Sequence, residues 1–185
     1  MKTQYYTAVS LDGYIADADH SLDWLHQFGG DDESSYPAFI RGVGAIAMGS
    51  TTYEWVLKHH VYLDPAHPKP WPYDQPTWVF SSRSLPAVPG ADIRFASGDV
   101  APVHAEMREV AAGKNIWIVG GGELAARFHD RGLLDEIIVT IAPVILGGGA
   151  PLFTRKIAVP PLRVLEVRPQ ASGLTEMRLE VPKHA

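Results

Sequence analysis

Three short segments of this sequence have the composition of phosphate-binding turns. They are Gly49-Ser50-Thr51, Ser81-Ser82-Arg83 and Gly120-Gly121-Gly122. Glycine lets a backbone N–H group approach an anion closely, and hydroxyl and guanidinium groups donate hydrogen bonds to phosphate oxygens. The chemistry that these turns suggest is the binding of a phosphorylated nucleotide.

The third segment lies between a predicted strand and a predicted helix. Residues 116–119 are β-branched or aromatic and uncharged, which is typical of a strand buried on both faces, and residues 123–128 favour a helix. Strand, glycines and helix together direct free N–H groups and the helix dipole toward an anion such as a pyrophosphate. On this stretch alone, a tight turn that needs positive φ and binds nothing explains the glycines as well.

The same residues satisfy the dinucleotide fingerprint G-x-G-x-x-A through Gly120, Gly122 and Ala125. In Rossmann folds this fingerprint opens a βαβ unit near the start of the nucleotide domain. Here only about a third of the chain follows it, which is too little for a doubly wound sheet. The sequence therefore indicates a different cofactor-binding fold.

Hydrophobic runs predict strands that alternate with crossover helices and are followed by a β-rich ending. The strands are expected at 2–10, 45–48, 77–81, 91–96, 116–119, 135–142, 162–168 and 174–181, and helices at 36–41, after Gly49, at 100–112 and after Gly122. This order predicts an α/β fold with a mainly parallel central sheet, flanking helices and an antiparallel C-terminal edge. Because ligands bind beyond the carboxyl ends of parallel strands, the three polar turns are expected to meet there.

Helix starts and one long loop add local predictions. Ser50 or Thr51 is expected to cap the helix after Gly49, with Glu54 completing a capping box, and Asp99 is expected to cap the helix at 100–112. Residues 59–76 hold five prolines together with Trp71 and Tyr73. A loop of this length is expected to be ordered and to make functional or packing contacts.

Composition limits the classes of partner. The chain has 185 residues, which suits a single domain over 1–185. A net charge of −5 gives no support for nucleic-acid or membrane binding, and the absence of cysteine excludes disulfides and thiolate chemistry. The N-terminus lacks an apolar signal-peptide region, so a cytoplasmic protein is expected. His59, His60 and His67 lack a metal-binding pattern, so no metal site is predicted.

The order of motifs resembles the dihydrofolate reductase-like superfamily. It is most similar to the C-terminal reductase domain of the bifunctional riboflavin-biosynthesis deaminase–reductase and its stand-alone relatives. The matching segments cover nearly the whole chain and are Ser10-Leu-Asp-Gly-Tyr-Ile-Ala, Met48-Gly-Ser-Thr-Thr-Tyr-Glu, Val79-Phe-Ser-Ser-Arg, Ile118-Val-Gly-Gly-Gly-Glu-Leu, and Leu134-Asp-Glu-Ile with Pro143-Val-Ile-Leu-Gly-Gly-Gly-Ala-Pro-Leu-Phe.

This resemblance implies NADPH as the cofactor. By position, it places phosphates at Gly49, Ser50 and Thr51 and at Gly120, Gly121, Gly122, Glu123 and Leu124, and it makes Val119 a further cofactor-binding residue. It places the adenosine 2′-phosphate at Ser81, Ser82 and Arg83, and the nicotinamide against Ala8 and Ile15. Many relatives carry arginine where this chain has Ser50, so one cationic phosphate contact is missing here.

The function implied is hydride transfer from NADPH to a small heterocyclic substrate, as in 5-amino-6-(5-phosphoribosylamino)uracil reductase. The alternatives are a nucleotide-binding protein of the same fold without turnover, and a dihydrofolate reductase. Asp12 is the candidate proton donor, although the pair Asp12-Gly13 is also typical of a simple turn. The acidic run Asp31 to Glu33 is the next candidate. A homodimer is expected because the apolar run from Ile137 to Leu146 and the β-rich ending need cover.

Overall fold

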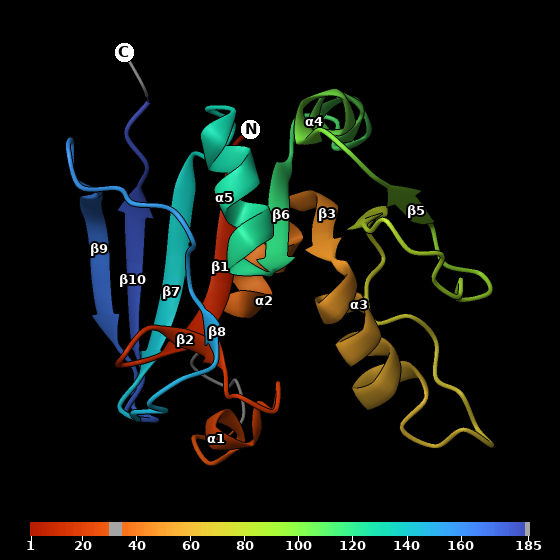
Figure 1. The fold of residues 1–185 in the computed structure, drawn as a ribbon, viewed down its shortest axis with the longest axis horizontal. Coiled ribbons are helices and arrows are strands. Elements are labelled where there is room, and N and C mark those ends of the chain that lie inside the picture. Colours follow the sequence, from red (N-terminus) through yellow and green to blue (C-terminus); the bar gives the residue numbers. More distant parts are fainter. Residues whose placement is uncertain (30–34, 184–185) are drawn as a thin grey trace.

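The computed structural model describes residues 1–29 and 35–183 and contains a central eight-stranded sheet (Figure 1). Its strands are β1 (Thr3–Ser10), β3 (Val43–Gly49), β4 (Thr77–Phe80), β5 (Ile93–Ala96), β6 (Asn115–Gly120), β7 (Glu136–Ala142), β9 (Arg163–Pro169) and β10 (Thr175–Glu180). The order across the sheet is β5-β4-β3-β6-β1-β7-β10-β9. The first six strands of this order are parallel, and β10 and β9 are added antiparallel at the edge. The predicted mainly parallel sheet with an antiparallel C-terminal edge is thus confirmed.

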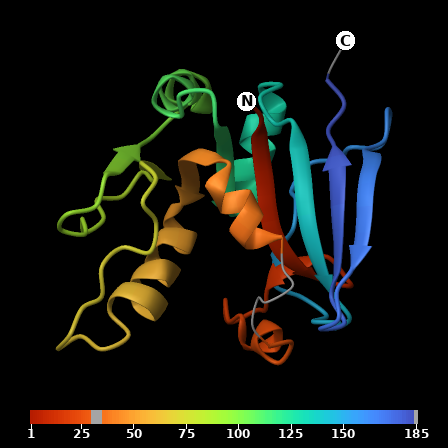
Figure 2. The ribbon, with the colours of Figure 1, turned by 180° about the vertical axis from the view of Figure 1, so that it is seen from behind.

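Helices cover both faces of the sheet. On one face, α4 (Val100–Val110) and α5 (Gly122–Asp130) pack over the strands, and α5 lies in front of the sheet in Figure 1. On the other face lie α2 (Tyr36–Arg41), which is in front in Figure 2, and α3 (Ser50–Val56), which continues into a π-helical turn η1 (Leu57–Val61). A small second sheet pairs β2 (Tyr14–Ala16) with β8 (Ala150–Pro151), and the short α1 (Asp23–His26) follows β2 in the chain.

The period of two along each strand divides the core into two layers. Tyr5 and Ile118 belong to the layer under α4 and α5, whereas their chain neighbours Tyr6 and Trp117 belong to the layer under α2 and α3. All four side chains are buried. Consecutive residues of β1 and β6 therefore serve opposite faces, and only one member of each pair can face a given ligand.

The predicted helix caps had different outcomes. Asp99 is the N-cap of α4 and accepts a hydrogen bond from the backbone N–H of Ala101 at 3.2 Å, as predicted. The prediction of a capping box at the start of α3 is wrong, because Gly49 is the N-cap and no side chain caps that end. Glu54 instead accepts a hydrogen bond from Arg83, because the loop after β4 lies beside α3.

The apolar side chains that need cover in a homodimer are not those that the sequence predicted. The run that was expected to need cover is largely strand β7, which is buried between β1 and β10 within the chain. Exposed apolar side chains lie instead on the edge strand β9, where Val164 is 54% and Val167 is 53% exposed. The homodimer stays a prediction, and β9 is now the surface that would carry it.

A buried carboxylate links the middle strands to the antiparallel edge. The side chain of Glu136 on β7 is 1% exposed and accepts hydrogen bonds from Lys2, from Gln4 Nε2 at 2.7 Å and from Arg178 Nη2 at 2.7 Å. Burial opposes ionisation of Glu136, but these hydrogen bonds hold its pKa below the ordinary value. The ionised network therefore ties β1 and β10 to β7.

No helix within residues 1–29 and 35–183 has the length and apolarity needed to cross a membrane.

Candidate active site

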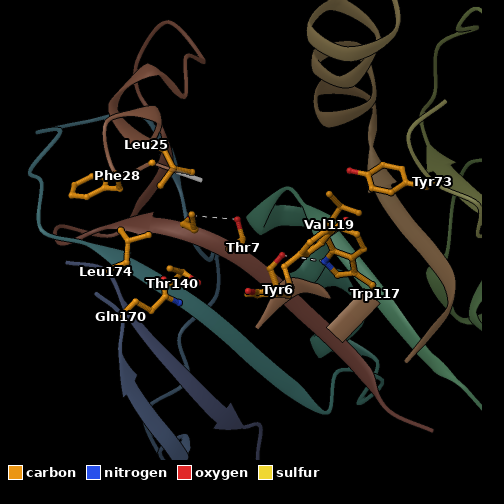
Figure 3. A pocket seen from close by; sticks show the side chains of 13 residues that line it. Tyr6, Thr7, Leu25, Phe28, Tyr73, Trp117, Val119, Thr140, Gln170 and Leu174 are labelled. Atoms are coloured by element: carbon orange, nitrogen blue, oxygen red, sulfur yellow. Dashed lines mark hydrogen bonds between the residues drawn. The ribbon is translucent and has the colours of Figure 1, made fainter. Parts of the chain in front are cut away.

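A cavity of about 360 Å³ opens on the α2 face of the sheet, toward the carboxyl ends of β1, β6 and β7 (Figure 3). Its strand-borne lining residues include Tyr6, Ala8, Trp117, Val119 and Thr140. These positions alternate along their strands, so their side chains share one face of the sheet. The cavity thus lies where open α/β sheets bind their ligands.

Loops complete the walls of this cavity. Leu25 and Phe28 come from α1 and the residues after it, and Gln170 and Leu174 come from the turn between β9 and β10. Figure 3 shows these four residues on one side of the cavity, with Tyr73, Trp117 and Val119 on the other. The pocket therefore depends on segments from both ends of the chain.

An aromatic cluster forms the second side. The ring of Trp117 meets that of Tyr73 at a centroid distance of 5.6 Å and that of Tyr36 at 5.7 Å, both in edge-to-face geometry. Tyr73 belongs to the proline-rich loop, and its neighbour Trp71 packs on Tyr53 of α3 at 5.5 Å. The prediction that this loop makes packing contacts is confirmed.

One polar network lies in the aromatic wall. The Tyr6 hydroxyl donates to a carboxylate oxygen of Glu176 at 3.0 Å and lies 3.0 Å from Ser35 Oγ, which also donates to Glu176. Burial raises the pKa of Tyr6 to about 12, so its hydroxyl keeps its proton at neutral pH. Arg168 donates to the other oxygen of Glu176 at 3.3 Å.

No local pattern predicts this network, because Glu176 lies 170 residues from Tyr6 along the chain.

The two glycine-bearing junctions are adjacent in the fold. A Cβ atom added to Gly120 would lie 2.9 Å from Thr52 Oγ1, so the end of β6 touches the first turn of α3. Neither α3 nor α5 has a side chain that caps its N-terminus, and Gly121, the N-cap of α5, has φ of 93°. Uncapped N–H groups of two neighbouring helices suit a diphosphate.

The glycines of this junction have different physical reasons. A Cβ atom on Gly122 would lie 2.5 Å from the carbonyl oxygens of Pro151 and Leu152, so close packing of the β8 segment requires glycine there. A Cβ atom on Gly49 would meet nothing within 4 Å, so the approach to α3 is open. Ser50 and Thr51 begin α3 beside that opening, and Leu124 is buried in the core.

Glu123, in the first turn of α5, faces the segment after β8. Its carboxylate accepts hydrogen bonds from both terminal nitrogens of Arg155, at 2.9 and 3.0 Å, and from Thr154 Oγ1 at 2.6 Å. The hydrogen bond from Arg155, followed by that from Thr154, lowers the pKa of Glu123. These contacts fix the segment that packs on Gly122.

The third polar turn lies next to the first. Ser81 Oγ accepts a hydrogen bond from the backbone N–H of Arg83 at 2.9 Å, which shapes the turn after β4, and Ser82 is exposed within it. Arg83 Nη2 donates to Glu54 of α3 at 2.8 Å, with both side chains largely exposed. The structure therefore brings all three predicted turns to one edge of the sheet.

Asp12 lies outside the residues that line the cavity. Its carboxylate accepts hydrogen bonds from Ser10 Oγ at 2.7 Å and from the backbone N–H groups of Leu146 at 3.1 Å and Gly147 at 2.7 Å. The hydrogen bond from Ser10, followed by those from the backbone, lowers the pKa of Asp12. This geometry supports the alternative in which Asp12 shapes the turn and anchors the glycine-rich loop, while its proton role stays a prediction.

Two further predicted site residues separate in the structure. Ala8 lines the cavity, whereas Ile15 is partly buried against the core under α4 and α5, and the nicotinamide contact expected of both stays a prediction. The other candidate acid, the run Asp31 to Glu33, lies outside the described residues. Among the described residues, no three histidine or carboxylate side chains are arranged to hold a metal ion.

Comparison with known proteins places this geometry in context. The family model of the RibD C-terminal domain matches residues 2–175. The uncharacterized protein YwjB of Bacillus subtilis (strain 168) is 37% identical over 152 residues, which is 82% of each chain. A crystal structure from Shewanella sp. PV-4, provisionally named a riboflavin biosynthesis protein, has a TM-score of 0.79 and 28% identity over 99% of this chain and 100% of that chain.

A bifunctional enzyme shares the fold at lower identity. The Thermotoga maritima diaminohydroxyphosphoribosylaminopyrimidine deaminase/5-amino-6-(5-phosphoribosylamino)uracil reductase has a TM-score of 0.64 and 18% identity, over 98% of this chain and 56% of that chain.

Proposed function

The chain belongs to the RibD C-terminal domain family, and from that premise we propose that it is an NADPH-dependent reductase of a small heterocyclic substrate. One observation carries the proposal: the contact of Gly120 with Thr52 brings the uncapped N-termini of α3 and α5 together, and Val119, one residue before Gly120, lines the aromatic cavity. Such an arrangement provides a site for a diphosphate next to a site for flat rings.

NADPH would supply a hydride to the substrate when bound. The residues suited to hold its diphosphate are Gly49, Ser50 and Thr51 at α3 and Gly120, Gly121 and the first turn of α5. The turn of Ser81, Ser82 and Arg83 offers hydroxyl and guanidinium donors to a 2′-phosphate. Ala8 and Val119 border the cavity and would pack against the nicotinamide.

The substrate would occupy the remaining part of the cavity. Aromatic side chains from β6, α2 and the proline-rich loop would hold a flat ring by edge and face contacts. The hydroxyl of Tyr6, fixed by Glu176, and the side chains of Thr140 and Gln170 would orient its polar groups. The activity would then resemble that of 5-amino-6-(5-phosphoribosylamino)uracil reductase, the activity for which the Thermotoga maritima protein is named.

The experiment that tests the proposal has two stages. Calorimetric titration should give one NADPH site per chain, and a substrate panel should then produce oxidation of NADPH in a 1:1 ratio with substrate loss. Absence of NADPH binding would overturn the proposal. Tight NADPH binding without oxidation by any compound would favour the alternative of a nucleotide-binding protein, and turnover of dihydrofolate alone would favour a dihydrofolate reductase.

A further inference from the structure

The cavity is lined without ionisable acids or bases other than tyrosine. Among the described residues that line it, none is Lys, Arg, His, Asp or Glu, and the polar side chains are those of tyrosine, tryptophan, Thr7, Thr140 and Gln170. Such a lining offers aromatic faces and neutral hydrogen-bonding groups. It offers nothing that balances the charge of a phosphate.

The segments around the cavity mouth also lack cations. Residues 11–29 contain Asp12, Asp17, Asp19 and Asp23 but no lysine or arginine. Residues 35–40 contain none either, and nor does the hairpin stretch 169–177 that carries Gln170 and Leu174. A substrate phosphate that extended out of the cavity past these segments would therefore meet no lysine or arginine in them.

The cation closest along this hairpin is already paired. Arg168 donates to Glu176 at 3.3 Å, and the side chain of Glu176 is only 10% exposed. Glu176 also accepts hydrogen bonds from Tyr6 and Ser35, which are neutral. If the Arg168 side chain moved away from Glu176 to bind a ligand, the buried carboxylate would lose its counter-ion. Arg168 is therefore the counter-ion of Glu176, and it does not line the cavity.

One donor in the cavity lacks a partner. The side-chain Nε2 atom of Gln170 is buried and makes no hydrogen bond within the described part of the chain. The backbone of Gln170 is fixed, because its N–H donates to Leu174 at 2.8 Å and its carbonyl accepts from Gly173 at 3.0 Å. A buried donor that is held in place and unpaired favours a ligand with an acceptor at that position.

We infer that the substrate of this site is a small, flat, unphosphorylated heterocycle with a carbonyl or ring-nitrogen acceptor that receives the Gln170 side-chain amide. The inference rests on the proposed reductase function and specifies its substrate class. The cavity volume of about 360 Å³ agrees with this class, since it lies near the lower end of the range of ligand pockets, roughly 300–1,000 Å³. A phosphate of charge about −2 would find no cationic side chain among the described residues that line the cavity.

The test compares a matched pair of probes, 5-amino-6-(ribosylamino)uracil and its 5′-phosphate. Each is titrated calorimetrically into the protein alone and into the protein saturated with NADPH. The unphosphorylated compound is expected to bind at least about 10-fold more tightly, a ratio that corresponds to about 1.4 kcal/mol. Equal or tighter binding of the phosphate, or no binding of either compound, would overturn the inference.

Two variants separate the parts of the argument. Gln170→Leu should weaken the unphosphorylated probe about 10-fold, and Gln170→Asn, which keeps an amide, should weaken it less. Leu174→Arg places a cation beside the cavity and should strengthen the phosphorylated probe about 10-fold relative to its partner. A thermal unfolding transition shows whether the Leu174→Arg variant is folded. If the folded variant leaves the ratio of the two affinities unchanged, charge does not set the preference between the phosphorylated and unphosphorylated probes.

NADPH titration of the same samples keeps the two proposals apart. Loss of NADPH binding with retained preference for the unphosphorylated probe would remove the reductase proposal but not the ligand class. Normal NADPH binding with a preference for the phosphorylated probe would remove the inferred ligand class but leave the reductase proposal standing.

Discussion

Arg83→Ala is expected to weaken NADPH binding about 10- to 100-fold while leaving NADH binding nearly unchanged. The guanidinium of Arg83 is 59% exposed beside the first turns of α3 and can donate to a phosphate placed there. A hydrogen bond between charged groups contributes about 1.5–3 kcal/mol, and each 1.4 kcal/mol is a factor of ten in affinity. NADH lacks the 2′-phosphate and so loses nothing at this position.

The ion pair with Glu54 provides a matched control. Arg83 Nη2 lies 2.8 Å from Glu54 Oε2, so a phosphate has to compete with that carboxylate. Exposed pairs of this kind are worth about 0.2–1 kcal/mol, so Glu54→Gln should raise NADPH affinity by up to about fivefold. The two variants should therefore move NADPH affinity in opposite directions.

Calorimetric titration of both cofactors into the wild type and the two variants measures these changes. The difference between NADPH and NADH should shrink at high salt, because the groups involved are exposed. The reasoning is refuted if the wild type binds both cofactors equally, or if Arg83→Ala weakens both by the same factor.

Three further changes test other parts of the structure. Asp12→Asn should lower the thermal transition temperature slightly and keep turnover near the wild-type value, because the carboxylate anchors the backbone of Leu146 and Gly147. A fall in turnover of about 100-fold with normal NADPH affinity would instead support the role of Asp12 as a proton donor. The chain is expected to form a homodimer in light scattering, and Val164→Glu on the exposed edge strand should give the mass of one chain, so a monomeric wild type would contradict this. The lowered pKa of Glu136 means that its ionised form stabilises the fold above the unfolded-state pKa of about 4.3 and that this contribution is lost as pH falls through the folded-state value. Glu136→Gln should therefore cost about 2 kcal/mol in urea unfolding at neutral pH and less near pH 3, and an equal cost at both pH values would show that the charge is not responsible.

The sequence by itself determined the strands of the central sheet and the helices α2 to α5, but not β2, β8 or η1. Uncharged β-branched runs produced strands such as β6 and β7 because their side chains can be buried on both faces of a parallel sheet. Asp99 capped α4 because a cap depends on atoms within three residues of each other. The three polar turns were also predictable, since each follows a strand whose carboxyl end lies at the same edge of the sheet.

Only the tertiary structure decided what those turns and loops contact. Glu54 is the fifth residue after the N-cap Gly49 and cannot complete a capping box; it pairs instead with Arg83, 29 residues away in sequence, because the loop after β4 lies beside α3. The cavity combines Gln170 from the last hairpin with Tyr6 from the first strand, and the carboxylate that fixes Tyr6 lies on β10. Propensity and capping act over a few residues, whereas these pairings follow from the order of strands across the sheet, which places β10 two strands from β1.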